Sequence, residues 1–253
     1  MNFTILRYHS LESTNTEAAK QARLGAEEGL CIMARSQTAG RGRHGREWIS
    51  TEGIGLYFSV VLRPRLAPKF IPLITLMAGV AVFDALKGYL SNPDIKWVND
   101  LLVGEKKIGG ILAETADTPS GLAVILGIGV NLKSKNLPLE LAGSATSIEA
   151  ETGKHVSADE FSEHLTGYLS YFYDMLGGEN GPRDIVAEWR QRSSYYSGKL
   201  VTVVLAGGVI SGVTNGLESN GALRVRRGDG SVSTIQAGDV ERLRSELHET
   251  QAF

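Results

Sequence analysis

Residues 95–132, with the sequence IKWVNDLLVGEKKIGGILAETADTPSGLAVILGIGVNL, consist of short apolar segments separated by turn residues. The turn signals are the pairs Asn99-Asp100 and Gly104-Glu105 and the triplet Pro119-Ser120-Gly121. The apolar segments between them have the length of strands. Strands that follow one another through such short connections pair as antiparallel hairpins. This stretch therefore predicts a largely antiparallel sheet.

Outward from this stretch, the chain combines further strands with helices. Apolar patterning predicts three more strands, at residues 3–8, 30–37 and 54–62, and a helix at residues 70–90. Three further helices have start signals, which are the capping boxes Thr14–Glu17 and Ser157–Glu160 and the proline Pro182. This mixture of elements predicts an α+β body.

The C-terminal part of the chain has a different pattern. After Tyr196, short β segments alternate with the turn pairs Gly207-Gly208, Asn220-Gly221 and Asp229-Gly230. About fifty residues of closely spaced strands are typical of a small SH3-like barrel. We therefore predict two domains, residues 1–197 and 198–253.

The composition limits the class of protein. The chain has 253 residues and a net charge of -2, which argues against a protein that binds nucleic acid over its whole surface. Its basic clusters are therefore local, and we expect them to bind a small ligand. The single cysteine, Cys31, has apolar neighbours, which predicts a buried, inert thiol in a reducing cytoplasm. No secretion signal opens the chain, and the apolar run at residues 71–86 contains Pro72 and Asp84 and is too short for a membrane span. We expect a cytoplasmic protein.

The segment Gly40-Arg41-Gly42-Arg43-His44-Gly45-Arg46-Glu47-Trp48 places three arginines between glycines that let the backbone approach a ligand closely. Its Gly-x-Gly-x-x-Gly spacing matches a dinucleotide-binding fingerprint, but a strand follows instead of the required helix. A solvated basic surface loop is the alternative that this segment alone leaves open.

The second segment, Lys96-Trp97-Val98-Asn99-Asp100, decides between these alternatives, because the two together closely resemble motifs of the biotin protein ligases. The first segment is similar to the biotinyl-adenylate loop of that family, and the second to its Lys-Trp-Pro-Asn-Asp motif, with Val98 in place of proline. The resemblance also covers further segments in the family's order, which are Ser13-Thr14-Asn15, Gln37, residues 107–114, residues 127–132 and residues 237–240.

The resemblance implies a fold and an activity. The fold is the class II synthetase-like catalytic fold, a mixed, largely antiparallel sheet with helices on one side, plus the SH3-like barrel. The activity joins biotin to ATP with Mg²⁺, releases pyrophosphate, and transfers biotin from biotinyl-AMP to a lysine of a biotin carboxyl carrier protein, as in acetyl-CoA carboxylase. Family members occur as monomers and dimers, so a homodimer stays open. Repressor members carry an N-terminal DNA-binding domain; the first strand here begins near Phe3, so we expect no DNA binding.

Site residues follow from the same resemblance. The catalytic candidates are Lys107, Arg43 and Asp100. The biotin-binding candidates are Ser13, Thr14, Asn15, Gln37, Gly40, Arg41, Gly42, Arg43, Lys107 and Gly110. The candidates for ATP and the adenylate are Arg41, Arg43, Arg46, Trp48, Lys96, Asn99, Lys107 and Asn131. No protein ligand for a metal is predicted.

The residue types leave several roles open. Asp100 can accept or guide the proton of the acceptor lysine, or it can form a turn with Asn99. Arg46 can bind ligand or form an ion pair with Glu47, and Trp48 can stack on adenine or anchor the core. Lys96 can stabilise phosphate or fix Asp100.

Two other classes of function also remain. A lipoate or octanoate transferase shares the fold, but some of these enzymes need a reactive cysteine, which Cys31 in an apolar strand does not supply. A non-catalytic biotin sensor binds biotin without ATP, whereas an RNA-binding protein with a basic loop loses affinity steeply with salt.

Overall fold

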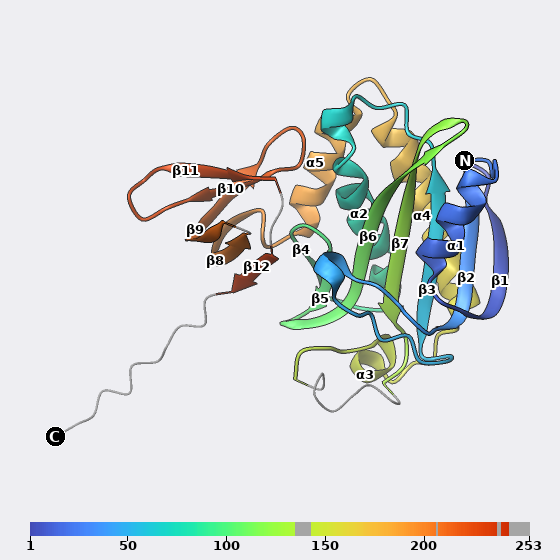
Figure 1. The fold of residues 1–253 in the computed structure, drawn as a ribbon. Coiled ribbons are helices and arrows are strands. Elements are labelled where there is room, and N and C mark those ends of the chain that lie inside the picture. The colour runs from blue at the N-terminus through green and yellow to red at the C-terminus, as the bar shows by residue number, and fades with distance from the viewer. Residues whose placement is uncertain (135–142, 206, 237–238, 243–253) are drawn as a thin grey trace.

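A computed structural model of the chain describes residues 1–134, 143–205, 207–236 and 239–242. Figure 1 shows a large sheet packed against helices and, beside it, a smaller β unit formed by the C-terminal strands. The strands of the large sheet are β1 (Thr4–Leu11), β2 (Leu30–Gln37), β3 (Gly55–Leu62), β4 (Pro93–Lys96), β5 (Asp100–Val103), β6 (Lys106–Thr118) and β7 (Gly121–Asn131). The helices are α1 (Thr14–Arg23), α2 (Leu73–Lys87), α3 (Ile148–Thr152), α4 (Ala158–Leu176) and α5 (Gly181–Arg192).

The order of strands in the large sheet is β1-β2-β3-β7-β6-β5-β4. Only β1 and β2 pair in parallel among these neighbours, and every other pair is antiparallel. The strands from residue 93 to residue 131 form consecutive hairpins, as the turn signals predict. The mixed, largely antiparallel sheet is confirmed.

The two faces of the sheet have different coverings, which corrects one detail of the prediction. Helices α2, α4 and α5 lie on one face and form the main hydrophobic core with it, as expected. Helix α1 lies on the opposite face, where Ala18 and Ala22 pack against Ile32, Val61 and Ile125. The helices are therefore not all on one side of the sheet, because α1 packs against apolar side chains of the second face.

Two of the three helix-start signals act as predicted, and one is displaced by a residue. The hydroxyl of Ser157 accepts a hydrogen bond from the backbone N–H of Glu160, and a proline occupies the first turn of α5. The N-cap of α1 is Ser13 rather than Thr14, and no side-chain cap bond forms there. The hydroxyl of Thr14 is instead engaged with Gln37, so a tertiary contact replaces the local cap.

Helix α2 is the central helix of the core. With the short turn before it, residues 68–87 are long and apolar enough to cross a membrane, which corrects the expectation that this run is too short. Of the most apolar part of residues 68–87, 67% is buried inside the protein. Its neighbours are α4, α5 and the sheet, so the packing is that of a core helix.

The C-terminal strands form a five-stranded antiparallel sheet. They are β8 (Ser197–Leu205), β9 (Gly208–Leu217), β10 (Leu223–Arg226), β11 (Val232–Ile235) and β12 (Asp239–Arg242), in the order β11-β10-β9-β8-β12. The indole N–H of Trp97 donates to the carbonyl oxygen of Gly221 at 2.9 Å, which connects the motif after β4 to this sheet. The boundary between two domains at residue 197 stays a prediction. Ala237 and Gly238 of the predicted segment 237–240, and residues 243–253, lie outside the described residues.

Candidate active site

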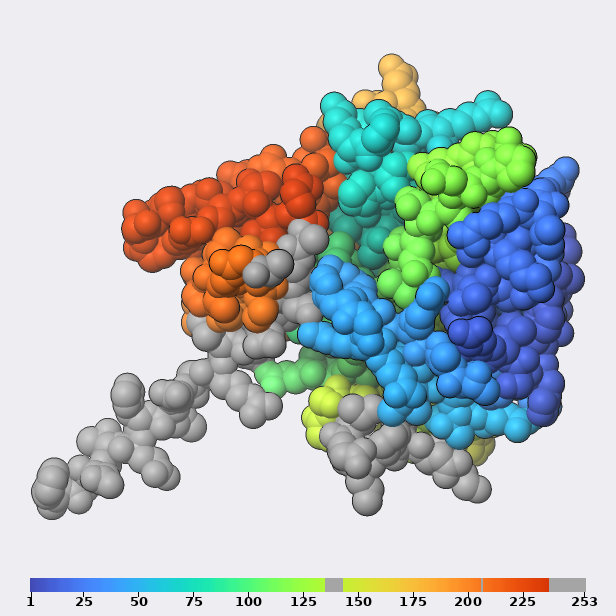
Figure 2. All heavy atoms as spheres, viewed as in Figure 1, coloured from blue at the N-terminus to red at the C-terminus, as the bar shows by residue number. Residues whose placement is uncertain are grey.

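The structure has a cleft that is lined by the start of α1, the arginine-glycine segment and parts of β3, β6 and β7. This cleft lies on the face of the sheet that carries α1. Along β3 and β7, Ser59 and Gly127 pair directly, as do Tyr57 and Gly129, and these side-chain positions share the face that Val61 and Ile125 offer to α1. The first residues of α1, Thr14 and Asn15, lie over Ser59 and Gly127 at one end of this strip. Figure 2 shows this side of the molecule, with the dark blue N-terminal residues against the green hairpin of β6 and β7.

Glycines form the floor of the cleft. Gly127 and Gly129 of β7 and Gly110 of β6 line it, and Gly110 pairs with Gly129. A Cβ atom on Gly127 would lie 2.3 Å from the side-chain oxygen of Asn15. A Cβ atom on Gly129 would lie 2.5 Å from the indole of Trp48. The glycines therefore give room to polar and aromatic groups that lie directly on the sheet.

The arginine-glycine segment crosses this floor as a small hairpin. Arg41 and Glu47 form an antiparallel bridge, and the backbone N–H of Gly42 donates to the carbonyl oxygen of Arg46 at 2.7 Å. The turn of this hairpin has positive φ angles at both central residues, 55° at His44 and 72° at Gly45. This is the geometry of a type I′ turn, which needs a residue such as glycine. The loop joins β2 to β3, as predicted.

Trp48 ends the hairpin and closes one side of the cleft. Its ring lies over Gly110 and Gly129, and the ammonium of Lys107 is 5.5 Å from the ring centroid. The indole N–H is buried and has no hydrogen-bond partner among the described residues. Trp48 therefore combines a structural contact with the floor and an aromatic face at the site.

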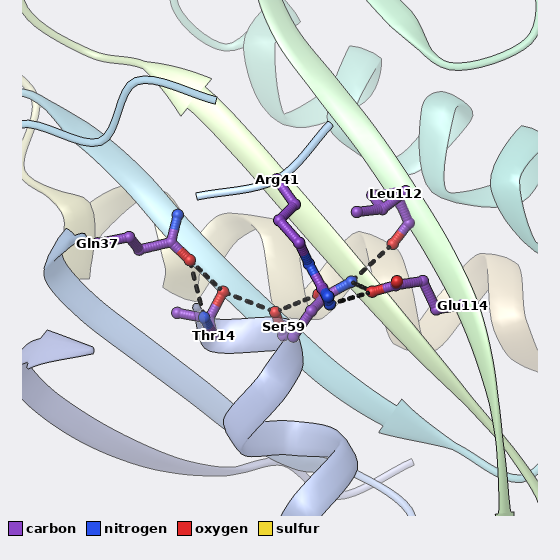
Figure 3. A network of polar contacts seen from close by, with 7 residues as sticks. Thr14, Gln37, Arg41, Ser59, Leu112 and Glu114 are labelled. Carbon is purple, nitrogen blue, oxygen red and sulfur yellow. Dashed lines mark hydrogen bonds and ion pairs between the residues drawn. The ribbon is translucent and has the colours of Figure 1, made fainter. Parts of the chain in front are cut away.

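A network of hydrogen bonds lies at one end of the cleft (Figure 3). The side-chain oxygen of Gln37 accepts from the backbone N–H and the hydroxyl of Thr14, at 2.7 and 3.1 Å. The amide nitrogen of Gln37 donates to Ser50, which is held in turn by the carbonyl oxygen of Trp48. The orientation of the Gln37 amide is thus fixed from both ends.

Ser59 extends this network under the cleft. It is fully buried, and its hydroxyl contacts Thr14 Oγ1 at 2.7 Å and Asn15 Oδ1 at 2.6 Å. The amide nitrogen of Asn15 donates to the carbonyl oxygen of Leu112 and to Glu114, at 3.3 and 2.7 Å. These groups are neutral except for Glu114, so this end of the cleft suits a ligand with polar, uncharged edges.

Cations gather at the other part of the cleft. Arg43 donates to the side-chain oxygen of Asn99 at 3.1 Å, and Asn99 donates to the carbonyl oxygen of Ile111. Arg41 lies where the two parts meet, because the Glu114 oxygen 2.9 Å from its guanidinium also accepts from Asn15. The ammonium of Lys107 lies 2.6 Å from Asp100 Oδ1. Arg41, Arg43 and Lys107 thus line a single cleft, and Arg46 lines it as well.

The position of Lys107 depends on a bulge in β6. Asp100 pairs with Gly110, whereas Leu102 pairs with Lys107, so β6 contains one residue more than β5 over this stretch. Lys107 and Gly110 are three residues apart, so in an uninterrupted strand they would point to opposite faces. With the bulge between them, a Cβ atom on Gly110 would lie 3.3 Å from Lys107 Nζ. The bulge therefore directs the lysine into the cleft.

The structure brings most of the predicted site residues together. Those that line the cleft are Ser13, Thr14, Asn15, Gln37, Arg41, Gly42, Arg43, Arg46, Trp48, Asn99, Asp100, Lys107 and Gly110. Three predicted residues are not among the lining residues. Gly40 packs beneath the loop against Trp48 and Ser50, Lys96 pairs with Asp100 across β4 and β5, and Asn131 donates to the carbonyl oxygen of Thr146.

Sequence reasoning assigned no role to several residues that build the cleft. Those at the site without a predicted role are Tyr57, Phe58, Ser59, Ile111, Leu112, Glu114, Gly127, Ile128 and Gly129. The glycine pair at positions 127 and 129 had a signal, because glycines two apart in an apolar strand mark a close approach on one face. The roles of Ser59 and Glu114 depend on contacts with α1 and the loop, which the local sequence does not reveal.

Two ionisable groups in the sheet are shifted by burial. Burial raises the pKa of the Tyr57 hydroxyl, which donates to the carbonyl oxygen of Thr51 at 2.8 Å. Burial also raises the pKa of the Cys31 thiol to about 12, and its burial confirms the expectation for this residue. Within the described part of the chain, no cluster of three or more His, Cys, Asp or Glu side chains could hold a metal ion.

Comparison with known proteins agrees with this geometry. Residues 8–131 match the biotin/lipoate A/B protein ligase family, and residues 196–243 match the biotin protein ligase C terminal domain. The chain is 33% identical over 236 residues to the biotin acetyl-CoA-carboxylase ligase of Paracoccus denitrificans, covering 90% of this chain and 96% of that one. It is also 33% identical over 242 residues to a bifunctional ligase/repressor of Bacillus subtilis, covering 93% and 73%.

Solved structures give the same result. The biotin protein ligase of Aquifex aeolicus in complex with biotin and ATP superposes with a TM-score of 0.83 at 26% identity, covering 94% of this chain and 99% of that one. The match extends over both the large sheet and the C-terminal strands. The chain belongs to the biotin protein ligases of the biotin/lipoate A/B protein ligase family.

Proposed function

We propose that this chain is an ATP-dependent ligase that activates biotin as biotinyl-5′-AMP, releases pyrophosphate, and transfers biotin to a lysine of a biotin carboxyl carrier protein. The observation that carries the proposal is the division of the cleft. One end holds neutral hydrogen-bonding groups around Gln37 and Ser59, the other holds the cations Arg43 and Lys107, and Arg41 lies between them at Glu114. Biotin has the same division, with a polar uncharged ring at one end and a carboxylate at the other.

The first step needs the cations. The carboxylate of biotin must attack the α-phosphate of ATP, and two like charges ~4 Å apart repel by ~4 kcal/mol at an effective dielectric constant near 20. Lys107, on the strand side, and Arg43, on the loop side, supply opposite charge from two directions. The planar guanidinium of Arg43 can bind two oxygens at once, whereas the ammonium of Lys107 acts as a point charge. These two residues hold the reacting anions and stabilise the transition state.

The neutral end of the cleft binds the ureido ring of biotin. The amide of Gln37 is fixed by Thr14 and Ser50, so its polar atoms are preorganised. The hydroxyl of Ser13 and the side chain of Asn15 line the same end. Preorganised donors and acceptors favour a ligand that matches them and cost little on binding.

The second step needs a base and shelter from water. The acceptor lysine has a free pKa of ~10.4 and is protonated at neutral pH, so a carboxylate beside the cations helps to remove its proton. Asp100 is the carboxylate that lies there, within 2.6 Å of Lys107. The arginine hairpin closes over the adenylate and keeps water away from the mixed anhydride. Trp48 gives the adenine an aromatic face.

The partners follow from the reaction. ATP brings Mg²⁺ on its phosphates, since this ion is usually bound through phosphates and water rather than by an all-protein cage. The carrier protein is that of acetyl-CoA carboxylase or a related carboxylase, and the enzyme works in the cytoplasm. The C-terminal sheet, with Arg224 and Arg226 on β10, forms a second domain beside the motif at Trp97.

A single incubation tests the proposal. The purified chain is mixed with labelled biotin, MgATP and a biotinyl carrier fragment, and the label on the carrier is measured; omission of ATP is the control. Label that depends on ATP and on the acceptor lysine supports the proposal. Binding of biotin without transfer would indicate a sensor, and transfer of lipoate or octanoate in place of biotin would indicate the related transferase class. Absence of both biotin binding and label on the carrier would reject the ligase assignment, and salt-sensitive binding of RNA in a separate assay would then indicate an RNA-binding protein.

A further inference from the structure

Glu114 of β6 connects the two ends of the cleft. One oxygen of its carboxylate, Oε2, accepts from Asn15 at 2.7 Å and from Arg41 at 2.9 Å (Figure 3). Asn15 belongs to α1 and Arg41 to the hairpin between β2 and β3. A single carboxylate oxygen therefore joins the network beneath the neutral end to the loop that carries the cations.

The carboxylate stands on the fixed side of this connection. Glu114 lies within the longest strand of the sheet and pairs with Ile125 of β7. Asn15, its second partner, is held by Ser59 and by the carbonyl oxygen of Leu112. Arg41 projects from the hairpin between β2 and β3, and the side chains of Arg41 and Glu114 are 48% and 39% exposed. The backbone of Glu114 is fixed by pairing in the sheet and its carboxylate is held by Asn15, so the strand sets the position at which the arginine is held.

The contact leaves the guanidinium able to bind a ligand. A guanidinium has five N–H donors in a fixed plane, and Glu114 receives one of them, from Nη2. Fixing one donor orients the plane, and the remaining donors can meet an anion. An arginine that is oriented in advance loses less conformational entropy when it binds.

We propose that Glu114 is a positioning residue that holds Arg41 in the orientation in which it receives the anionic part of the biotin substrate. This inference rests on the proposed function. Glu114 acts through Arg41 and does not itself touch the reacting atoms. An arginine that binds the carboxylate to the same extent in the ground state and in the transition state contributes to substrate binding and not to the chemical step, so we expect Glu114 to affect KM more than kcat.

The first test measures biotin-dependent exchange of pyrophosphate into ATP by the Glu114→Gln variant of the full chain. Glutamine keeps an oxygen for Asn15 but removes the charge that holds the guanidinium. We expect the KM for biotin to rise by about fivefold or more with kcat changed by less than about twofold. The matched control is Asp117→Asn, three residues further along the same strand, at an exposed carboxylate. It should leave both constants unchanged.

A double-mutant cycle tests whether the effect passes through Arg41. In an Arg41→Gln background, Glu114→Gln should change the KM for biotin by less than about twofold, because the group that it positions is absent. A full additive effect in that background, or a Glu114→Gln variant that behaves like Asp117→Asn, would overturn the inference. A lower KM would also overturn it, because Glu114 would then compete with the substrate for Arg41.

Two readouts separate this result from other failures. Thermal unfolding of each variant reports on a merely structural role, which would lower the midpoint and the active fraction but leave the KM for biotin unchanged. Wild-type protein without biotin-dependent exchange would reject the proposed function itself. Wild-type exchange together with an unaffected Glu114→Gln variant would reject only the role of Glu114.

Discussion

The ammonium nitrogen of Lys107 lies 2.6 Å from Oδ1 of Asp100, across the pair of strands β5 and β6. Both side chains are partly exposed, at 36% and 24%, and both line the cleft. In the proposed mechanism, the lysine serves the adenylation step and the carboxylate serves the transfer step. Substitution of each partner should therefore affect a different half of the reaction.

Lys107→Ala should slow the formation of biotinyl-AMP by about a hundredfold or more, because the loss of ~3 kcal/mol of transition-state stabilisation has that effect. Single-turnover formation of biotinyl-AMP measures this rate. Lys106→Ala is the matched control, since Lys106 is the exposed neighbour on the same strand. A near-normal rate for Lys107→Ala would remove this lysine from the mechanism.

Asp100→Asn should keep adenylation within about tenfold of wild type but slow the transfer from preformed biotinyl-AMP to the carrier more strongly. Without the carboxylate, the reaction depends on acceptor amine that is already deprotonated. Its rate should then rise about tenfold per pH unit between about pH 7 and 9, because the amine has a free pKa of ~10.4. Single-turnover transfer across this pH range gives the profile. Parallel profiles for the variant and wild type would show that Asp100 only orients Lys107.

Gly129→Ala should displace the indole of Trp48, since the new Cβ atom would lie 2.5 Å from the ring. We expect the KM for ATP to rise by about tenfold, in line with the loss of ~1.4 kcal/mol of aromatic stacking. Gly167→Ala is the control, because a Cβ atom there meets no atom within 4 Å. Unchanged ATP kinetics with Gly129→Ala would mean that Trp48 serves only as a packing group.

Trypsin should cut the hairpin at residues 40–46 more slowly when biotin and ATP are both present. Arg41 and Arg46 are exposed on the hairpin, and we expect additional contacts with the adenylate to order its backbone. Mass spectrometry of the fragments over time measures cleavage at each arginine. Equal rates with and without the two substrates would contradict the closure of the loop.

Cys31 should react very slowly with a thiol reagent in the native protein. Burial disfavours the charged thiolate and raises the pKa of Cys31 to about 12, so at pH 8 only ~1 in 10⁴ thiols is ionised. Denatured protein should react at once, and an absorbance assay with an aromatic disulfide follows both rates. Rapid labelling of native protein would show that β2 opens readily.

The hairpins and helix starts could be predicted because they depend on residues that are close together in the sequence. The turn signals between residues 95 and 122 placed each hairpin, and Ser157 caps α4 through a bond to Glu160 three residues away. The face chosen by α1 could not be predicted in this way. Its small alanines, Ala18 and Ala22, fit against either side of a sheet, and only the packing against Ile32 and Val61 decides.

The site shows the same division between local and distant information. Motif residues such as Arg43, Asn99 and Lys107 carried their own signal, and the structure brings them to one cleft. Ser59 and Glu114 did not, since a serine in an apolar strand and a glutamate in a strand have ordinary local roles. Their contacts with Asn15 bring together segments that are distant in the chain, and those contacts form only when the sheet does.

The extra residue in β6 makes the count of residues as informative as their identity. If the same residues paired without the bulge, Ile108 would lie opposite Leu102 and would take the place of Lys107 on the cleft face. The ammonium would then emerge among the apolar side chains beneath the sheet. In searches for working relatives or in redesign of this enzyme, the bulge is therefore a feature to keep together with the residues on either side of it.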